Sequence, residues 1–152
     1  MTPGTGIWMN NSLGEFELNR RGLHALPVGT RLPSNMAPTI ARSGPRTLAI
    51  GSPGADRITT AIVQSVAGVV GARLPLDAAI RHPRLHVVRR DGDVEVWHEE
   101  DLDLPDVPYP TRVFPPTSML FGGVAAVEDG GERGVDAQAD PRRDGAARVG
   151  AA

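Results

Sequence analysis

The chain has 152 residues and a mass of 16.1 kDa, a size that suits one domain or one piece of a larger one. Its 16 basic residues are all arginine and nearly balance 18 acidic ones, so the composition disfavours a nucleic-acid or anionic-membrane partner. The absence of cysteine excludes disulfides, thiolate zinc sites and a cysteine nucleophile, and no apolar run approaches the ~18 residues that a membrane span needs.

Short elements dominate the start of the chain. Residues 6–11 predict a strand, because three large apolar side chains follow a turn. Residues 12–33 show no sustained period and predict a long ordered loop. The apolar runs 37–42 and 46–50 predict a hairpin, with residues 43–45 as its three-residue connection.

The clearest boundary is the segment Gly-Ser-Pro-Gly-Ala at residues 51–55. After it, apolar residues recur at helical spacing and predict a helix over 55–72. Pro75 opens a second predicted helix over 76–82, which Pro83 ends. The order of strand, tight turn and helix therefore places the backbone amides of the turn at a helix start.

The second half of the chain predicts two hairpins separated by a long connection. Alternating apolar residues predict one pair of strands at 85–89 and 94–98 and another at 118–127 and 135–139. The acidic, proline-rich stretch 99–116 lies between the two hairpins and predicts a connection on the surface.

Neither the acids nor the histidines predict a metal site. The acidic run that begins at Glu99 lacks the glycine and ligand alternation of a calcium loop, so a solvated surface is expected. His82 and His86 are four residues apart, but Pro83 between them prevents a shared helical face. We therefore expect no metal and no cofactor.

Four motifs in order along the chain carry a family resemblance. They are Asn-Asn-Ser-Leu-Gly-Glu-Phe at 10–16, Pro-Ser-Asn-Met-Ala-Pro-Thr at 33–39, Gly-Ser-Pro-Gly-Ala at 51–55 and Ala-Asp-Pro-Arg-Arg-Asp-Gly at 139–145. Together they resemble the γ-glutamyltransferase family, also called γ-glutamyltranspeptidases or glutathione hydrolases, of the N-terminal nucleophile hydrolase superfamily. The resemblance covers residues 6–145 and matches the C-terminal part of the family's small subunit.

The resemblance implies an α/β fold of the α+β kind, a partial αββα sandwich with mostly antiparallel strands and two packed helices. Residues 1–145 would form the C-terminal portion of a small subunit, and residues 146–152 a frayed tail. Because the partner sheet is absent, an apolar face should be exposed and the chain should self-associate. The arginines of the 140–143 motif are expected to play a structural role, pairing with acids and carbonyls at the end of the sheet.

The turn at 51–55 is a candidate oxyanion site on physical grounds, because successive N–H groups at a helix start carry partial positive charge. In the family, the turn resembles the oxyanion hole, where two adjacent glycines donate their N–H groups to the tetrahedral intermediate. Gly54 and Ala55 occupy these positions here. Ala55 departs from the second glycine and keeps its donor provided that its φ is negative. The alternative is a tight turn without a catalytic role.

Five polar residues match the family's acyl-donor pocket. Ser34 and Asn35 lie where the family usually has two serines that bind the α-carboxylate of the γ-glutamyl group. Ser12 and Glu15 lie where it usually has a Gln and an Asp that hold the α-amino group, and Asn11 belongs to the adjoining motif. Asn35, Ser12 and Glu15 differ from the residues that the family usually has, and these differences concern acyl-donor specificity more than the fold. The alternative is that these are turn or cap residues.

The family's nucleophile is a threonine that self-cleavage turns into a new N-terminus, with its own α-amine as general base. That threonine, the large subunit and a carboxylate-binding arginine there are expected to lie upstream of this chain. Thr2 would carry both required groups after loss of Met1, but its position is wrong and Pro3 stiffens the segment.

Two functions therefore stay open. The first is a C-terminal fragment of an enzyme that transfers or hydrolyses γ-glutamyl or related acyl groups, with a glutathione-like substrate and a large-subunit polypeptide as partners; alone it is expected to be inactive. The second is a non-catalytic remnant or binding module that keeps only the scaffold. No signal peptide opens the chain as given, which favours the cytoplasm, although family members can be exported.

Overall fold

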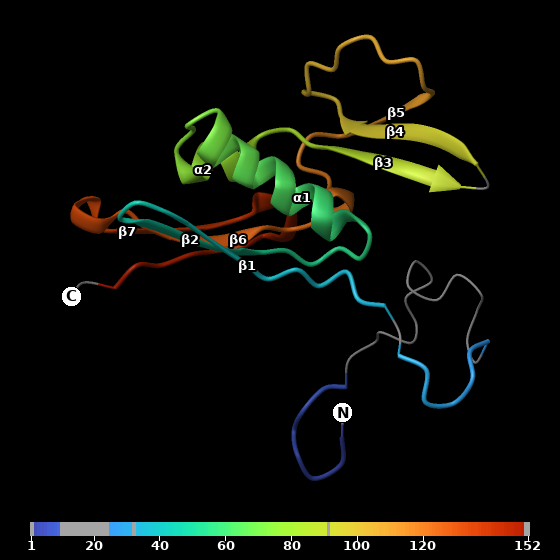
Figure 1. Cartoon of the computed structure of the whole chain (residues 1–152), viewed down its shortest axis with the longest axis horizontal. Helices are drawn as coiled ribbons and strands as arrows, with labels where there is room; N and C mark the ends of the chain where they lie inside the picture. The colour runs from blue at the N-terminus through green and yellow to red at the C-terminus, as the bar shows by residue number, and fades with distance from the viewer. Residues whose placement is uncertain (1, 10–24, 32, 91, 151–152) are drawn as a thin grey trace. The chain divides into compact units, whose positions relative to one another are not determined.

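The structure is a computed structural model that describes residues 2–9, 25–31, 33–90 and 92–150. The chain divides into two compact units, Met1–Asn35 and Met36–Ala152. Within the described residues, every helix and strand belongs to the second unit, where two sheets and two α-helices are arranged as Figure 1 shows.

The larger sheet has four antiparallel strands in the order β1-β2-β6-β7. They are β1 (Thr39–Ser43), β2 (Arg46–Gly51), β6 (Ala125–Asp129) and β7 (Val135–Ala139). Both hairpins that the sequence predicts here are confirmed. The first has a two-residue connection instead of three, because Ser43 pairs with Arg46 and Gly44 supplies a positive φ of 58°.

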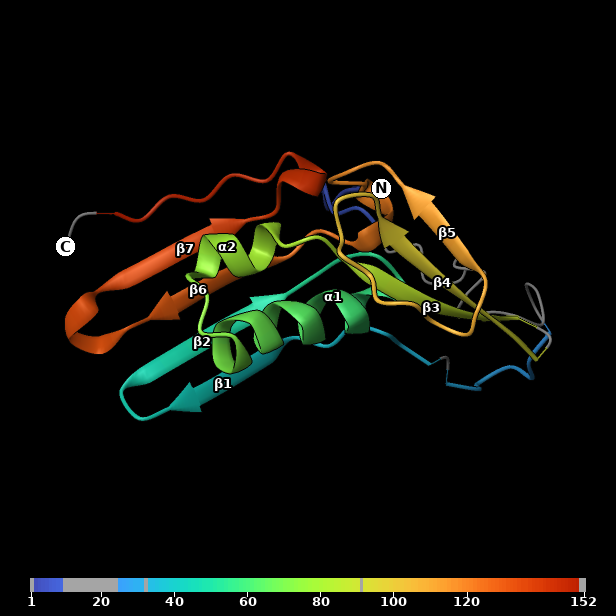
Figure 2. The same cartoon turned by 90° about the horizontal axis from the view of Figure 1, so that it is seen from above.

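Two helices lie over one face of this sheet (Figure 2), α1 (Arg57–Val66) and α2 (Leu76–Arg81). Both predicted helices are thus confirmed, and α1 continues as a π-helix over Ala67–Gly71. The apolar side chains of the helices and the sheet meet in one core, formed by Leu48, Ile50, Ile58, Ala61, Ile62, Val69, Leu76, Ala79, Ile80, Val124 and Ala126. We call this core the apolar layer.

The smaller sheet contains β3 (Leu85–Arg90), β4 (Asp93–Glu99) and β5 (Thr111–Phe114). The predicted hairpin of β3 and β4 is confirmed. The prediction that 99–116 is only a solvated connection is wrong at both ends, because β5 pairs in parallel with β4 and Glu99 is 0% exposed. The ring of Phe114 packs 5.5 Å from that of Trp97, which helps to explain the strand that composition did not reveal.

Two predicted strands differ from the structure. Within 118–127 the strand begins only at Ala125, because Gly122 has a positive φ of 89° and lies close to the 51–55 turn: a Cβ on Gly122 would lie 3.1 Å from the Pro53 carbonyl oxygen. Residues 6–9 form no strand, since the Ile7 carbonyl accepts a hydrogen bond from the Thr2 N–H at 2.8 Å inside a turn. The rest of that predicted strand lies outside the described residues.

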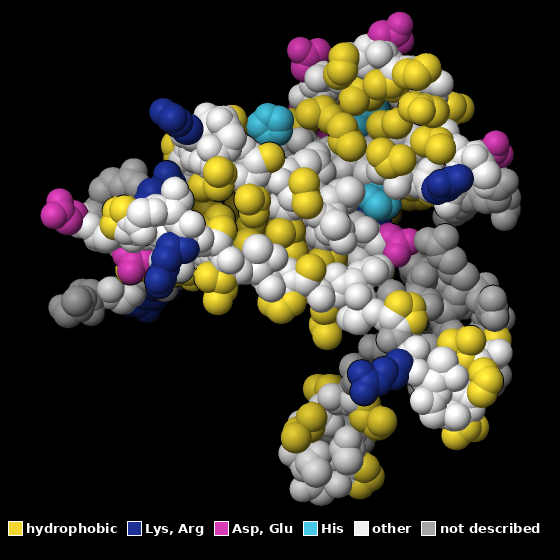
Figure 3. Space-filling model, in the orientation of Figure 1, with side chains coloured by type: hydrophobic (Ala, Val, Ile, Leu, Met, Phe, Trp, Pro, Cys, Tyr) yellow, Lys and Arg dark blue, Asp and Glu magenta, His cyan; other side chains and the backbone are white. Residues whose placement is uncertain are grey.

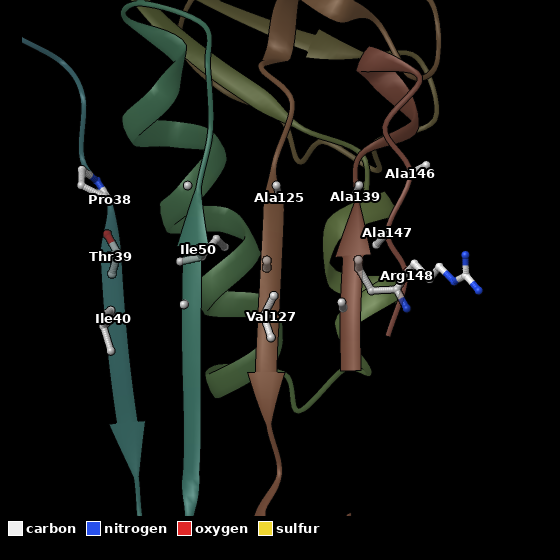
Figure 4. A pocket seen from close by; sticks show the side chains of 15 residues that line it. Pro38, Thr39, Ile40, Ile50, Ala125, Val127, Ala139, Ala146, Ala147 and Arg148 are labelled. Atoms are coloured by element: carbon white, nitrogen blue, oxygen red, sulfur yellow. The ribbon is translucent and has the colours of Figure 1, made fainter. Parts of the chain in front are cut away.

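The sheet face opposite the helices is turned toward the viewer in Figure 4. Small and apolar side chains form this face, and Ile40 is 77% and Val127 45% exposed. Ala146 and Ala147, of the stretch after β7, lie beside the sheet's edge. The exposed apolar face agrees with the sequence; self-association stays a prediction, which light scattering at high protein concentration tests.

The described elements form an α+β fold with mostly antiparallel strands, as the sequence predicts. Hydrophobic side chains also gather at the surface over β4, β5 and the chain between them (Figure 3), where Tyr109 is 49% and Val113 56% exposed. In the part of the chain that the structure describes, no helix combines the length and apolar character needed to cross a membrane.

Candidate active site

The turn 51–55 joins β2 to α1. The carbonyls of Gly54 and Ala55 accept hydrogen bonds from the N–H groups of Arg57 and Ile58 at 3.0 and 3.1 Å, which starts the helix. The N–H groups of Gly54 and Ala55 themselves donate no hydrogen bond to any described residue. Two successive amides at a helix start can therefore serve an anion or a developing oxyanion.

The backbone of this turn is left-handed at both residues. The φ of Gly54 is 131° and that of Ala55 is 51°. The condition that the sequence interpretation set for Ala55, a negative φ, is therefore not met. Its N–H persists whatever the φ, and the consequence is strain instead, since a side chain in this conformation costs about 1 kcal/mol or more. A glycine at this position would avoid that cost.

The turn packs against two adjacent glycines of another segment, Gly122 and Gly123. The hydroxyl of Ser52 accepts a hydrogen bond from the N–H of Gly123 at 3.1 Å and donates one to the Pro53 carbonyl at 2.8 Å. A Cβ on Gly54 would lie only 3.1 Å from the Cα of Gly122. Backbone thus packs directly on backbone, and a side chain would separate the turn from its support.

A buried histidine lies beside the first turns of α1. The Nδ1 atom of His86 in β3 lies 3.0 Å from the hydroxyl oxygen of Thr60 in α1. Burial lowers the pKa of His86 below its ordinary value, and the charge of Arg57 lowers it further, against the opposing effect of Asp56. His86 is therefore neutral at pH 7 and holds the helix to the strand through an uncharged contact.

Four buried charged side chains, Arg84, Glu99, Asp140 and Arg142, form what we call the charge cluster. Arg84 Nη1 lies 2.7 Å from Asp140 Oδ2, and Arg142 pairs with both Glu99 and Asp140. Each of these side chains is at most 1% exposed. The two positive and two negative charges balance, and both arginines also donate to the carbonyl of Ile80 at the end of α2, at 2.9 and 3.1 Å.

The two arginines of the cluster differ in their electrostatics. Burial lowers the pKa of Arg84, as does the charge of Arg142, and Asp140 only partly offsets these effects. Burial acts on Arg142 in the same direction, but its hydrogen bonds to Glu99 and the charge of Glu99 outweigh it, so the pKa of Arg142 is raised. The structural role predicted for the 140–143 motif is confirmed, because Arg142 pairs with acids and donates to carbonyls.

None of the residues predicted to bind substrate belongs to the turn or to the charge cluster. Ser34 is exposed and Asn35 half-buried, in a stretch of the first unit without helix or strand, and both have interaction partners. Asn11, Ser12 and Glu15 lie outside the described residues. The acyl-donor pocket therefore stays a prediction. Among the residues that the structure describes, no three His, Cys, Asp or Glu gather to hold a metal ion.

The glycines that support the turn were not predicted from the sequence. Gly122 and Gly123 interrupt a strand-like pattern, and paired glycines in such a pattern often mark a close backbone approach, so this signal was available. Glu99 and Arg84 gave no comparable signal, because their partners lie far away in the sequence.

The fold is that of the N-terminal nucleophile hydrolases. The structure resembles the γ-glutamyltranspeptidase of Pseudomonas nitroreducens, solved in complex with L-DON, with a TM-score of 0.69 and 25% sequence identity over 84% of this chain and 68% of that one. The sequence profile of the γ-glutamyltranspeptidase family matches residues 1–150. The chain belongs to the γ-glutamyltranspeptidase family, which confirms the resemblance that the four motifs indicate.

Curated relatives agree with this assignment. The Acylase ACY 1 proenzyme of Pseudomonas sp. strain V22 is 33% identical over 85 residues, and the glutathione hydrolase proenzyme of Pseudomonas aeruginosa is 32% identical over 97. The matches cover 55% and 57% of this chain but 15% and 17% of those proteins. The chain thus spans about a sixth of the length of these relatives.

Proposed function

We propose that this chain is the part of a γ-glutamyl-transferring or γ-glutamyl-hydrolysing enzyme that stabilises the oxyanion, and that a further polypeptide supplies the nucleophile. The observation that carries the proposal is the pair of N–H groups on Gly54 and Ala55, which make no hydrogen bond to any described residue. When a threonine hydroxyl attacks the acyl carbonyl, its oxygen gains negative charge. Two adjacent donors stabilise this charge most in the transition state, which raises kcat.

The substrate proposed for this site is a glutathione-like γ-glutamyl compound. Ser34 and Asn35 would bind its α-carboxylate and Glu15 would pair with its α-ammonium group, with Ser12 and Asn11 as further residues of the substrate pocket. The similarity to an acylase as well as to a glutathione hydrolase supports a related acyl group as a second substrate class. A comparison of γ-glutamyl and other acyl anilides as substrates separates the two.

A non-catalytic remnant is the second candidate function. Ala55 supports it, because a side chain stands in a left-handed conformation within the proposed oxyanion turn. A remnant would keep the scaffold and lose turnover whatever polypeptide is supplied. Reading the DNA upstream for an in-frame large subunit and nucleophilic threonine is the first discriminating observation.

The decisive assay compares the chain alone with the chain plus a polypeptide that supplies the rest of the family's enzyme. The chain alone should show no turnover of a γ-glutamyl anilide, because loss of a nucleophile lowers kcat by about 10⁶ in a well-studied protease. The complemented enzyme should be active, and Thr2→Ala should leave its activity unchanged. Turnover by the chain alone that Thr2→Ala abolishes would contradict the proposal and make Thr2 the nucleophile. An inactive complemented enzyme would favour the remnant.

A further inference from the structure

The segment between β5 and β6 is held by the charge cluster. The N–H of Ser118 donates to Glu99 Oε1 at 2.8 Å, and the N–H of Val124 donates to Asp140 Oδ2 at 2.9 Å. Between these two, Arg84 Nη1 donates to the Phe121 carbonyl at 3.0 Å. Three backbone groups of one short segment are therefore fixed by charged side chains that are themselves buried and paired.

The same segment also contacts the candidate oxyanion turn, through Gly122 and Gly123. Gly122 lies against Gly54 and Pro53, and a Cβ on Gly122 would stand 3.1 Å from the Pro53 carbonyl oxygen. Gly123 donates to the Ser52 hydroxyl at 3.1 Å. Because Gly122 packs on the turn backbone against backbone, a displacement of the segment at this contact passes to the turn without a flexible side chain to absorb it.

We propose that the charge cluster positions the Gly54 and Ala55 amides, acting through the segment 118–124. Glu99 and Asp140 are positioning residues in this scheme, since their hydrogen bonds hold the segment and the segment in turn contacts the turn. The inference rests on the proposed function, because the amides matter to catalysis only if they face an oxyanion. The structural part of the inference, that the charges determine the position of the turn, does not depend on that function.

Charged groups suit this task better than apolar ones. A carboxylate that accepts several N–H groups fixes both distance and direction, whereas apolar contacts permit sliding. Glu99 accepts from the N–H groups of Ser118 and Arg84, each at 2.8 Å, and from Arg142. Precision of this kind is needed at an oxyanion site, where a misplacement of about 1 Å can lower the rate roughly 100-fold.

The test is Glu99→Gln in the 152-residue chain, followed by amide NMR. The variant keeps the shape of the side chain and removes the charge and one of the two carboxylate acceptors. We expect the amide resonances of Gly54 and Ala55 to shift, and hydrogen exchange of the Ser118 N–H to become roughly tenfold faster. The matched control is Glu100→Gln, at the exposed neighbouring residue, which should leave the Gly54 and Ala55 resonances in place.

A cluster that only stabilises the fold would give a different result. In that case Glu99→Gln would shift the resonances of Ser118 and Arg84 but leave those of Gly54 and Ala55 unchanged, and the proposal would be wrong. If the single variant does not fold, the double variant Glu99→Gln with Arg142→Gln removes one charge of each sign and decides by the same comparison.

The readout needs neither nucleophile nor substrate, so its outcome is independent of the proposed function. In the complemented enzyme, the same Glu99→Gln change should lower kcat roughly 10- to 100-fold with KM nearly unchanged. If the Gly54 and Ala55 amide resonances shift but kcat is unchanged, the cluster positions the turn, and the claim that this positioning serves catalysis is wrong.

Discussion

The apolar layer and the charge cluster are both buried, yet they are built in different ways. The layer joins α1 and α2 to the four-stranded sheet through aliphatic side chains, which contribute by area and tolerate small changes of shape. The cluster joins the smaller sheet to the rest through four charges, each of which depends on its partners. Substitutions of equal size should therefore have unequal effects in the two regions.

The largest effect is expected in the charge cluster, for Asp140→Asn. Both carboxylate oxygens of Asp140 accept from donors, among them the N–H groups of Val124 and Arg142, so an amide NH₂ would face a donor. The change also leaves an unbalanced positive charge. We expect the free energy of unfolding to fall by about 3–5 kcal/mol, measured by urea denaturation.

The control for this variant is Asp136→Asn, at an exposed position of β7, the strand that Asp140 follows. It should change the free energy of unfolding by less than about 0.5 kcal/mol. An Asp140→Asn effect as small as that of the control would show that the cluster is hydrated, and the contrast between the two regions would be lost.

A smaller effect is expected in the apolar layer, for Ile62→Val. Ile62 is 5% exposed, and removal of one methyl group loses some burial and leaves a small cavity. The expected loss is about 1 kcal/mol in the same denaturation experiment. The matched control is Val63→Ala on the exposed side of α1, where little burial is lost. A loss at Ile62 equal to that at Asp140 would contradict the comparison.

The contact between α1 and the smaller sheet should respond to pH through His86. Its folded pKa lies below the ordinary value of about 6.5, so the unfolded chain binds more protons as the pH falls through that range. The free energy of unfolding should therefore be greatest above pH 6.5 and fall below it. His86→Gln should flatten this dependence, with His82→Gln as the exposed control; an unchanged slope in the His86 variant would assign the effect elsewhere.

The smallest effect, and one of opposite sign, is expected in the turn. Ala55→Gly should stabilise the chain by up to about 1 kcal/mol, because glycine relieves the positive φ of 51°. The same change at Ala49 in β2 should destabilise it by about 0.5–1 kcal/mol, since a strand favours a side chain. A loss of stability in both variants would mean that Ala55 is not strained.

The same contrast explains what the sequence could predict. The two helices and three hairpins follow from spacings within one short stretch, and so does the turn at 51–55 between a strand and a helix. The burial of Glu99 could not be predicted from the sequence, because it depends on pairing with Arg142, 43 positions away. β5 was missed for a related reason, since Thr111–Phe114 becomes a strand only through parallel pairing with β4.

Within the candidate site, residue types could be predicted but not conformation. Local order indicates the turn, and the family resemblance indicates Gly54 and Ala55 within it, whereas the positive φ of Ala55 and the role of Gly122 depend on packing between distant segments. A single sequence indicates a close backbone contact at Gly122 and Gly123, but it does not show that the contact is with the 51–55 turn.

The most direct test replaces one hydrogen-bond donor, the Ala55 N–H, and keeps the Ala55 side chain; the ester also weakens the Gly54 carbonyl as an acceptor for the Arg57 N–H. Lactic acid in place of Ala55, introduced by nonsense suppression, replaces the backbone N–H with an ester oxygen in the complemented enzyme. The account predicts that kcat for a γ-glutamyl anilide falls about 10²- to 10³-fold while KM changes little, because the donor acts on the transition state. A kcat equal to that of the unmodified enzyme would contradict the assignment of Gly54 and Ala55 as the oxyanion site.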